Sequence, residues 1–369
     1  MDKKLVYKIA ISLIPGIGSI NARKLIAYTG SLEGVFSEKR QTLMKIPGIG
    51  ETLSRKVSDK SILEKAELEI KYLDEHRVKA MFYLDKDYPE RLRQCTDAPI
   101  MLFQKGECDL NSLKIISVVG TRNATQRGRD LCQKLIAEIT KYHPETVIVS
   151  GLAYGIDVAA HKAALKNDLK TVAVLAHGLS TLYPSLHRSV ANEIINQGAL
   201  VTDFISSELP ERNNFVKRNR IIAGLSDATI VVESGIKGGA LITADLANSY
   251  NRDVFAFPGR VSDDWSKGCN RLIFTNKAFL IEDLRDLEYI MGWEREPNNP
   301  KVIQTSLFQN LNHEEHLIVE LLQENDQLSI DQISLKLQFP ISKVSFLLLN
   351  LEFKGLIKSL PGKSYKLFR

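Results

Sequence analysis

The chain has 369 residues, of which 44% are hydrophobic and 25% are charged, a composition typical of a globular protein with about two or three domains. Its net charge of +5 is too small to identify an anionic partner, so the positions of the cations must do so. The cysteines at 95, 108, 132 and 269 form no CxxC pair and have no matching histidine pair, which argues against a zinc site and a disulfide framework. With no cleavable leader and no apolar run approaching about 18 residues, we expect a cytoplasmic protein that neither is secreted nor spans a membrane.

Residues 1–77 contain a repeated string. Pro15-Gly16-Ile17-Gly18 recurs as Pro47-Gly48-Ile49-Gly50, at an interval of 32 residues. Two helix-hairpin-helix units in a helical, SAM-like domain would give this pattern, because the proline and first glycine end one helix and the second glycine lets backbone amides approach a phosphate. Two plain helix turns in a small bundle would give it as well. The repeat therefore leaves open whether these hairpins touch DNA.

Residues 78–293 predict an α/β domain. Short strand-like pieces between 78 and 106 lead into six apolar, β-branched runs, and most of these runs are separated by stretches long enough to hold a helix. Such runs predict a Rossmann-like, doubly wound and mostly parallel sheet that is covered on both faces. Ligands of such a sheet bind beyond the carboxyl ends of its strands. The runs begin at Ile115, Val147, Thr171, Ala199, Ala228 and Val254.

The end of the chain predicts a linker and a small separate domain. Residues 294–310 are polar and rich in proline and asparagine, which is typical of a linker. Residues 311–369 show three helical patterns and two short strands around Pro361-Gly362, the pattern of a winged helix. The third helix, 341–354, carries only Lys343 and Lys354 against Glu352, so contact with a protein is at least as well supported as reading of a DNA groove.

Basic and glycine-rich turns follow the predicted strands and indicate a binding site for a polyanion. Lys217 and Arg220 would share a helix face with Gly224 and converge on a phosphate, whereas Arg218 lies toward the apolar side, where it must pair with an acid or reach an anion. A solvated basic helix with one buried ion pair is the alternative. Gly151 and Gly155 would let the backbone fold against a phosphate, and Asp157 would cap the next helix. The candidate phosphate-binding residues are Gly120, Thr121, Arg122, Ser150, Gly151, Gly155, Lys217, Arg218, Asn219, Arg220, Ser234, Gly235, Lys237 and Gly238.

The sequence gives little support to catalysis or to a cofactor. No GxGxxG and no GxxxxGK[ST] string occurs, so no cofactor is predicted. Ser150 and Ser234 lack a histidine and an aspartate in an order that suggests a triad, and the histidines lack metal spacing. We therefore predict no catalytic residue and no metal. Phe215 and Tyr154 would either stack on bases or pack in the core.

These strings resemble those of the DNA-processing protein A (Smf) family of bacterial cytoplasmic proteins of natural transformation and recombination. The matching pieces are VVGTRNATQRG, VSGLAYGIDVAAHKAAL, AVLAHGLSTLYPSLHR, NFVKRNRIIAGLS, VVESGIKGGALITADLA and VFAFPG, followed by SKGCNRLI. The resemblance implies binding of single-stranded DNA, a homodimer, loading of a RecA-type recombinase onto that DNA, and no established catalytic site. It places DNA-contacting residues at Arg122 and at Arg218-Asn219-Arg220. Val216 replaces a usual proline, and Asn251 replaces a glycine at a turn that asparagine also tolerates.

One alternative function is an enzymatic one. The turn from Glu233 to Thr243 superficially resembles that of the nucleotide-processing hydrolases of the lysine-decarboxylase-like Rossmann type. Those enzymes carry a PGGxGT string, and ESGIKGGALIT lacks its proline and its GT. The alternative is therefore the weaker of the two.

Overall fold

The computed structural model describes residues 3–295, 311–325, 327–354, 356–360 and 364–367. The chain divides into two compact units, Met1–Glu296 and Pro297–Arg369. Most of the predicted linker, 294–310, and the predicted turn at Pro361-Gly362 lie outside the described residues. In the described part of the chain, no helix is both long enough and apolar enough to cross a bilayer.

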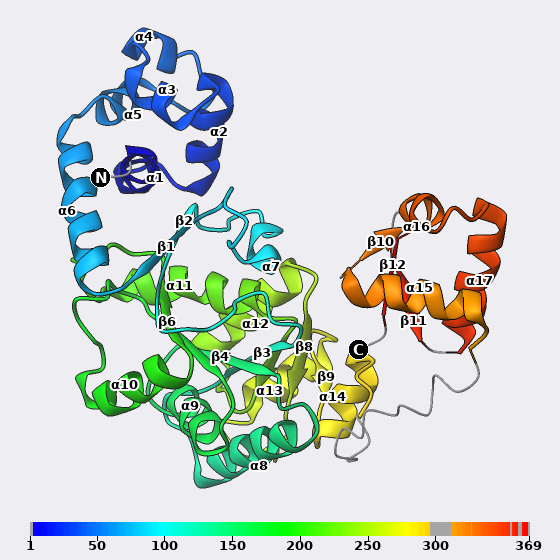
Figure 1. The fold of residues 1–369 in the computed structure, drawn as a ribbon. Coiled ribbons are helices and arrows are strands. Elements are labelled where there is room, and N and C mark those ends of the chain that lie inside the picture. The colour runs from blue at the N-terminus through cyan, green and yellow to red at the C-terminus, as the bar shows by residue number, and fades with distance from the viewer. Residues whose placement is uncertain (1–2, 296–310, 326, 355, 361–363, 368–369) are drawn as a thin grey trace. The chain divides into compact units, whose positions relative to one another are not determined.

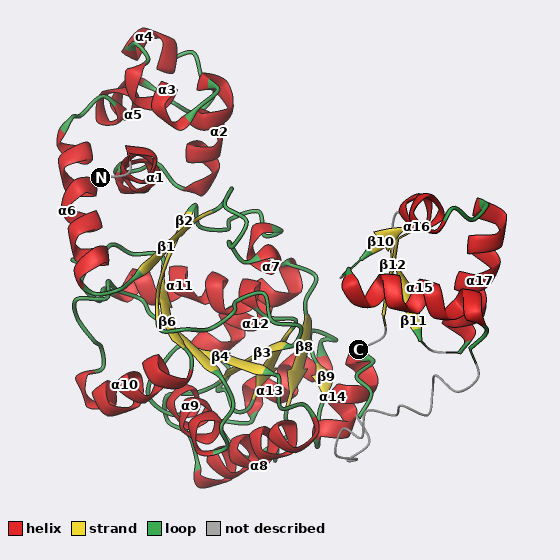
Figure 2. Cartoon of the chain, in the orientation of Figure 1, coloured by secondary structure: helices red, strands yellow, loops and turns green. Residues whose placement is uncertain are grey.

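The first unit begins with a block of helices, shown in red in Figure 2. Its apolar side chains form one hydrophobic cluster, which also takes in Phe82, Met101 and Phe103 from the strands that follow. The helices therefore share a core with the edge of the sheet, across the domain boundary predicted at residue 77. The helices are α1 (Lys3–Leu13), α2 (Ser19–Thr29), α3 (Leu32–Ser37), α4 (Arg40–Leu43), α5 (Glu51–Val57) and α6 (Ser61–Glu75).

The described residues of the first unit contain a nine-stranded sheet with the order β1-β2-β6-β5-β4-β3-β7-β8-β9. The strands β3 to β9 run parallel to their neighbours, and β1 and β2 add an antiparallel extension at the edge beside β6. All six predicted runs form strands of this sheet, which confirms the Rossmann-like fold. The strands are β1 (Lys79–Phe82), β2 (Met101–Lys105), β3 (Ile115–Val119), β4 (Val147–Ser150), β5 (Thr171–Val174), β6 (Ala199–Thr202), β7 (Ala228–Val231), β8 (Asp253–Ala256) and β9 (Phe279–Leu280).

Helices cover both faces of this sheet because both faces are apolar. Figure 1 shows α11 and α12 on one side of the strands and α8 and α9 on the other. Alternate residues of the central strands pack on these opposite sides: Ile115 and Val119 belong to the cluster with α11 and α12, and Ile116 and Val118 belong to the cluster with α8, α9 and α14. The helices and one 3₁₀ turn are α7 (Glu90–Arg93), α8 (Gln126–Tyr142), α9 (Ile156–Lys166), η1 (Ser185–His187), α10 (Arg188–Gln197), α11 (Arg212–Leu225), α12 (Gly239–Ser249), α13 (Lys267–Phe274) and α14 (Leu284–Met291).

The strand order reverses between β3 and β7. From β3 the chain passes through β4 and β5 to β6 on one side, and then returns to place β7, β8 and β9 on the other side. In an open parallel sheet the crevice at such a switch point is where ligands bind. The fold therefore predicts a site between the carboxyl ends of β3 and β7.

The second unit is a winged helix, as predicted. Three helices enclose a core that includes Ile318, Ile333, Val344 and Leu348, beside a three-stranded sheet of order β10-β12-β11. The elements are α15 (His313–Glu324), β10 (Leu328–Ser329), α16 (Ile330–Leu337), α17 (Ile341–Phe353), β11 (Ile357–Leu360) and β12 (Ser364–Leu367).

Candidate functional site

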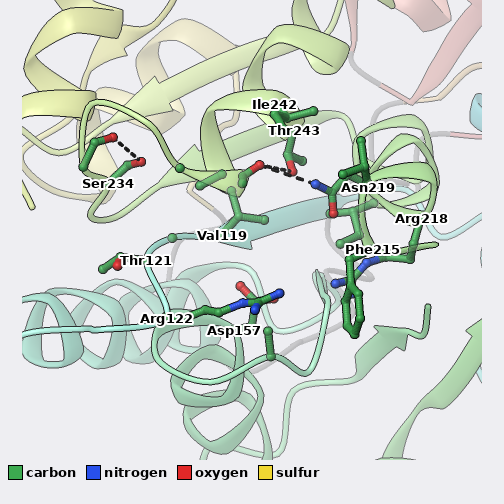
Figure 3. A pocket seen from close by; sticks show the side chains of 18 of the residues that line it. Val119, Thr121, Arg122, Asp157, Phe215, Arg218, Asn219, Ser234, Ile242 and Thr243 are labelled. Atoms are coloured by element: carbon green, nitrogen blue, oxygen red, sulfur yellow. Dashed lines mark hydrogen bonds between the residues drawn. The ribbon is translucent and has the colours of Figure 1, made fainter. Parts of the chain in front are cut away.

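A cavity of about 690 Å³ lies at the switch point, between the loops that follow β3 and β7 and the helices α11 and α12. We call it the sheet-edge pocket (Figure 3). Its wall includes most of the predicted phosphate-binding residues, which come from three separate stretches of the chain. These are Gly120, Thr121, Arg122, Arg218, Asn219, Ser234, Gly235, Lys237 and Gly238.

Three cations of the pocket wall are exposed. Arg122 comes from the loop after β3, Arg212 starts α11, and Lys237 comes from the turn before α12. None of them forms an ion pair with any residue that the structure describes. Their charges are therefore available to an anion in the pocket.

Aromatic rings stand beside these cations. The guanidinium carbon of Arg122 lies 5.4 Å from the centre of the Phe215 ring, a cation–π contact that holds the two side chains across the pocket (Figure 3). Phe215 also meets Tyr183 edge to face, with ring centres 5.7 Å apart. Trp265 lines the pocket next to Gly235. The wall thus combines positive charge with flat apolar surface.

Arg218 differs from the other cations because it is only 3% exposed. Its Nη1 donates a hydrogen bond of 2.6 Å to the carbonyl oxygen of Val174, while its Nε is buried without a partner in the described structure. Burial lowers the pKa of Arg218 to about 10, although the nearby carboxylate of Asp157 counteracts this effect. Arg218 is therefore still charged at neutral pH and forms the floor of the pocket. The apolar orientation predicted for it is confirmed.

Asp157 does not cap the following helix as we expected. Gly155 is the N-cap of α9, and Asp157 lies inside the first turn, buried. Burial raises the pKa of Asp157, while Arg218 and the backbone N–H groups of Ala153 and Gly151 act in the opposite direction. Asp157 is thus the acid that balances the buried guanidinium.

The glycines after β4 pack against protein groups and not against open space. A Cβ on Gly151 would lie 1.9 Å from Nη1 of Arg218, and a Cβ on Gly155 would lie 2.1 Å from the carbonyl oxygen of Thr121. Gly155 also has a φ of 79°, which side chains rarely adopt. Neither glycine lies in the wall of the sheet-edge pocket, so their predicted contact with a phosphate stays a prediction. They let the loops after β3 and β4 interlock and so position Thr121 and Arg122.

Further backbone contacts fix the rim of the pocket. The N–H of Thr121 donates to the carbonyl oxygen of Glu233 at 2.7 Å, which joins the ends of β3 and β7. The carbonyl oxygen of Gly239 accepts hydrogen bonds from Asn219 Nδ2 and Thr243 Oγ1, each at 3.4 Å (Figure 3). The bond from Asn219 connects α11 to α12 in the pocket wall, and the bond from Thr243 lies within α12.

Four of the predicted residues besides Gly151 are absent from the pocket wall, namely Ser150, Gly155, Lys217 and Arg220. Ser150 is buried and donates a hydrogen bond of 2.6 Å to the carbonyl oxygen of Val118. Lys217 is exposed on α11. Arg220 pairs with Asp203 at 2.5 Å and also donates to the carbonyl oxygen of Asp97.

The predicted convergence of Lys217 and Arg220 beside Gly224 is wrong. A Cβ on Gly224 would lie 2.6 Å from Leu92 and 3.0 Å from the sulfur of Cys95, so this glycine packs against the protein and not against a ligand. Arg220 is used to hold α11 to neighbouring segments. Arg220 is therefore partly buried by its protein partners, whereas Lys217 of the same helix is exposed.

Several pocket residues were missed in the sequence. Tyr183, Arg212, Ile242 and Trp265 line the pocket but lie outside the basic and glycine-rich strings that the sequence analysis identified. Arg212 was findable, since it is the first residue of the helix that carries Lys217 and Arg218. Trp265 gave no local signal, because a loop after β8 brings it to the site.

The histidines near the site are structural. Burial, with the nearby charges of Arg218 and His187, lowers the pKa of His161 to about 3, so its ring stays neutral. Its Nδ1 lies 2.8 Å from Thr171 Oγ1. His187 Nδ1 lies 2.8 Å from the carbonyl oxygen of Leu152. The described residues contain no group of three or more histidine, cysteine or acidic side chains that could hold a metal ion.

Comparisons with known proteins agree with this architecture. The family model for the DNA recombination-mediator protein A matches residues 79–291, and the model for the DprA winged helix domain matches residues 307–363. Protein Smf from Synechocystis sp. is 30% identical over 401 residues, covering 99% of each chain. DNA processing protein DprA from Streptococcus pneumoniae is 43% identical over 190 residues, covering 52% of this chain and 66% of that protein.

Two solved structures resemble this chain. The X-ray structure of DNA processing protein A from Streptococcus pneumoniae gives a TM-score of 0.64 at 31% identity and covers 79% of this chain and 99% of its own. The structure of DNA processing protein A from Helicobacter pylori, which binds single-stranded DNA, gives a TM-score of 0.54 at 25% identity. It covers 60% of this chain and 98% of its own.

Proposed function

This chain belongs to the DNA recombination-mediator protein A family, and from that premise we propose that it binds single-stranded DNA in the sheet-edge pocket. The observation that carries the proposal is the set of three exposed, unpaired cations, Arg122, Arg212 and Lys237, in the described wall of a cavity at the switch point of the sheet. The Helicobacter pylori relative, which binds single-stranded DNA, has a similar fold. Its ligand supports the choice of a single strand.

The side chains divide the work between phosphates and bases. Arg122, Arg212 and Lys237 neutralise phosphates, because they are exposed and form no ion pair with the described residues. Phe215 and Trp265 offer flat apolar surface on which bases stack without regard to sequence. The resulting binding is broad in sequence and sensitive to salt.

Because Arg218 is buried and Arg220 is paired with Asp203, we expect the affinity for single-stranded DNA to depend less on salt concentration than the sequence alone predicts. If the four cations Arg122, Lys217, Arg218 and Arg220 all contacted phosphates, the log–log slope of affinity against salt would be about 3, since each contact to a single strand contributes about 0.7. The three exposed cations of the pocket wall give a slope of about 2. A salt series therefore measures how many of these cations meet phosphate.

The direct test is fluorescence anisotropy with labelled oligo-dT for wild type and for Arg122→Ala. We expect Arg122→Ala to weaken binding roughly fivefold and to lower the slope by about 0.7, because one phosphate contact is lost. Lys166→Ala is the matched control, since Lys166 is an exposed cation at the far end of α9, which runs back from the site. Equal affinities for wild type and Arg122→Ala, or equal losses in both variants, would contradict the proposal.

We also propose that the DNA-bound protein is a homodimer that loads a RecA-type recombinase. Both properties come from the family resemblance, and the pocket geometry supports only the DNA step. Sedimentation at micromolar concentration tests the dimer. Recombinase ATPase activity on single strands coated with a single-strand-binding protein tests loading, and Arg122→Ala should reduce the stimulation at DNA concentrations where its binding is incomplete.

A hydrolase acting on nucleotides is the alternative. Asp157 is the one carboxylate among the described residues of the pocket wall, and it is buried beside Arg218, where it serves as a counter-ion. Incubation with nucleoside monophosphates should release no free base. If wild type releases free base and Asp157→Asn does not, the hydrolase becomes the better-supported function.

A further inference from the structure

A second cavity lies beside the sheet-edge pocket, and Trp265 lines both. Its volume is about 400 Å³, and it lies between the end of β7, the start of α8 and the loop that follows β8. We call it the acidic pocket, because its described wall holds three carboxylates and one cation. These residues are Glu233, Asp263, Asp264 and Arg127.

Backbone hydrogen bonds fix the loop that forms one wall of the acidic pocket. The N–H of Ser234, which follows β7, donates to the carbonyl oxygen of Trp265 at 2.7 Å. The N–H of Gly268 donates in turn to the carbonyl oxygen of Ser234 at 2.8 Å. Within the loop, the N–H of Ser266 donates to the carbonyl oxygen of Asp263 at 3.0 Å. The end of the sheet therefore holds this loop in place through the backbone.

Glu233 forms the buried part of the wall and is only 3% exposed. Its Oε2 accepts a hydrogen bond of 2.9 Å from the N–H of Thr125, and its Oε1 accepts one from the hydroxyl of Thr125. The carboxylate fits against the first turn of α8 because that position is a glycine: a Cβ on Gly128 would lie 2.3 Å from it. A carboxylate has about four acceptor positions, so Glu233 is fixed in place and still has acceptor capacity for a ligand.

The two exposed carboxylates of the pocket differ in their partners. Asp264 lies 2.6 Å from Nζ of Lys267, and this hydrogen bond lowers the pKa of Asp264. Asp263 forms no ion pair with the residues that the structure describes. The cation of the wall, Arg127, donates from Nη2 to the carbonyl oxygen of Pro258 at 2.9 Å. Asp263 is therefore the exposed carboxylate that is available to a ligand.

The two neighbouring pockets have opposite charge. The described wall of the sheet-edge pocket holds four cations and one carboxylate, Asp157, whereas that of the acidic pocket holds three carboxylates and one cation. A phosphate is therefore attracted to the first and repelled by the second. A base carries no charge at neutral pH, and Trp265 gives it a surface for stacking. Side by side, the two pockets match the two chemically different parts of a nucleotide.

We propose that the acidic pocket binds one base of the single strand and prefers guanine. The inference rests on the proposed function, because phosphates in the sheet-edge pocket bring the strand to the acidic pocket. Guanine presents two adjacent donors, N1–H and N2–H, on its Watson–Crick edge, and these match the two oxygens of a carboxylate. Thymine has one N–H there, between two carbonyl oxygens that a carboxylate repels. Adenine and cytosine place an amino group beside a ring acceptor.

The preference concerns one nucleotide only. Stacking on Phe215 and contacts to phosphates do not read sequence, so the strand as a whole is still bound broadly. A guanine that reaches the acidic pocket adds affinity in one register of the strand. The preference is therefore measured with short strands, in which few registers compete.

The first test is fluorescence anisotropy of the full chain with three short labelled strands. These are oligo-dT, the same strand with one central dG, and the same strand with one central deoxyinosine, which keeps N1–H but lacks the N2 amino group. We expect the dG strand to bind at least about fivefold more tightly than oligo-dT, the lower limit for a bidentate contact to a base. The deoxyinosine strand should differ from oligo-dT by less than about twofold, because it cannot make the bidentate contact.

Asp263→Asn tests the acceptor. An amide replaces one acceptor oxygen by a donor, so we expect the advantage of the dG strand to fall below about twofold. The affinity for oligo-dT and the melting temperature should stay close to those of wild type, because Asp263 is exposed. Asp130→Asn is the matched control, since Asp130 is exposed on α8, lines neither pocket and carries the same charge. This control should keep the full advantage of dG.

Trp265 gives an independent readout. The chain has two tryptophans, so Trp293→Phe leaves Trp265 as its only indole. We expect the dG strand to quench the fluorescence of Trp265 more strongly than oligo-dT does, because guanine stacks beside it. Asp263→Asn should remove this difference.

The outcomes separate this inference from the proposed function. If wild type binds none of the strands, both are contradicted. Equal binding of oligo-dT and the dG strand, or an advantage of dG that survives Asp263→Asn, overturns the inference and leaves the proposed function standing. If Asp263→Asn changes no DNA affinity but lowers the stimulation of recombinase ATPase activity, the pocket holds a cationic side chain of a protein, which also overturns the inference.

Discussion

The sheet-edge pocket and the third helix of the winged-helix unit both carry cations where a nucleic acid could bind, but the cations are in opposite circumstances. In the pocket, Arg122 and Lys237 are exposed and form no ion pair with the described residues. In the winged helix, Lys343 lies 2.5 Å from Glu314, and Lys354 lies 2.7 Å from Glu315. Acidic residues of α15 thus neutralise the lysines on and just after the third helix.

The exposed surface of that third helix is apolar instead. Phe346 and Phe353 of α17 are 63% and 82% exposed, and Leu349 is 50% exposed. Helices that enter a DNA groove present cations and amides, so this surface fits the groove poorly. The comparison teaches that the partners of a cation, and not the name of the fold around it, decide whether it can meet a phosphate.

The largest effect that tests this rule comes from Arg218, which lies in the pocket wall but is buried. We expect Arg218→Ala to lower the free energy of unfolding by about 3–5 kcal/mol, because Asp157 would keep a buried charge without its counter-ion. Urea denaturation monitored by circular dichroism measures this change. Gly151→Ala should also destabilise, since its methyl group would lie 1.9 Å from Nη1 of Arg218.

Arg122, an exposed cation of the same pocket, is the control for Arg218. Arg122→Ala should change the free energy of unfolding by less than about 0.5 kcal/mol while weakening binding of DNA. Adding Asp157→Asn to Arg218→Ala should restore part of the lost free energy of unfolding, because the double variant has no unpaired buried charge at this position. If Arg218→Ala folds as well as wild type and only DNA binding suffers, Arg218 is a ligand contact and the rule fails.

The sequence was sufficient to predict the architecture of the α/β domain, because continuous apolar runs mark its buried strands. Each of the six runs in the α/β domain is buried on both faces of a parallel sheet, and such strands need continuous apolar residues. The turn at Asn251 has a φ of 56°, which agrees with the left-handed conformation expected for an asparagine in place of a glycine. The short edge strand β9 was missed, because two residues carry no periodic signal.

The site was only partly predictable because partners distant in sequence decide the role of each residue. The spacing of Arg218 predicted that its side chain points inward. It could not predict that the carbonyl oxygen of Val174 accepts its hydrogen bond or that Asp157 lies nearby as its counter-ion. No residue close to Arg220 in the sequence indicates that Asp203 is its ion-pair partner. Glycines after strands also look alike, whether they face a ligand or another loop.

A smaller effect concerns the ion pair inside the winged helix. We expect Lys354→Gln to destabilise this unit by about 1–2 kcal/mol at pH 7, because Glu315 is only 2% exposed and loses its charged donor. Hydrogen exchange of α15 and α17 in the full chain measures the change. Lys336→Gln is the control, since Lys336 donates a hydrogen bond of 3.3 Å to the neutral Asn325.

The same pair predicts a dependence on pH. Burial opposes ionisation of Glu315, but hydrogen bonds from Lys354 and from the N–H of Asn312 outweigh it and lower the pKa of Glu315 below 4.5. The stabilisation is therefore complete above the unfolded value of 4.5 and is lost as the pH falls through the lower folded value. The difference between wild type and Lys354→Gln should shrink over that range. A difference that stays constant into strong acid would show that Lys354 acts through packing.

The smallest expected effect is on DNA binding by the winged helix itself. Lys343→Gln should change the affinity for single-stranded and for duplex DNA less than twofold, because Glu314 already neutralises this lysine. Glu314→Gln is the sharper probe, since it frees the charge of Lys343 without removing it. If α17 approaches phosphates in the complex, Glu314→Gln will tighten binding and steepen the salt dependence by up to about 0.9 for a duplex. Unchanged anisotropy curves for both variants would show that Lys343 of α17 does not meet phosphate and would maintain the contrast with the sheet-edge pocket.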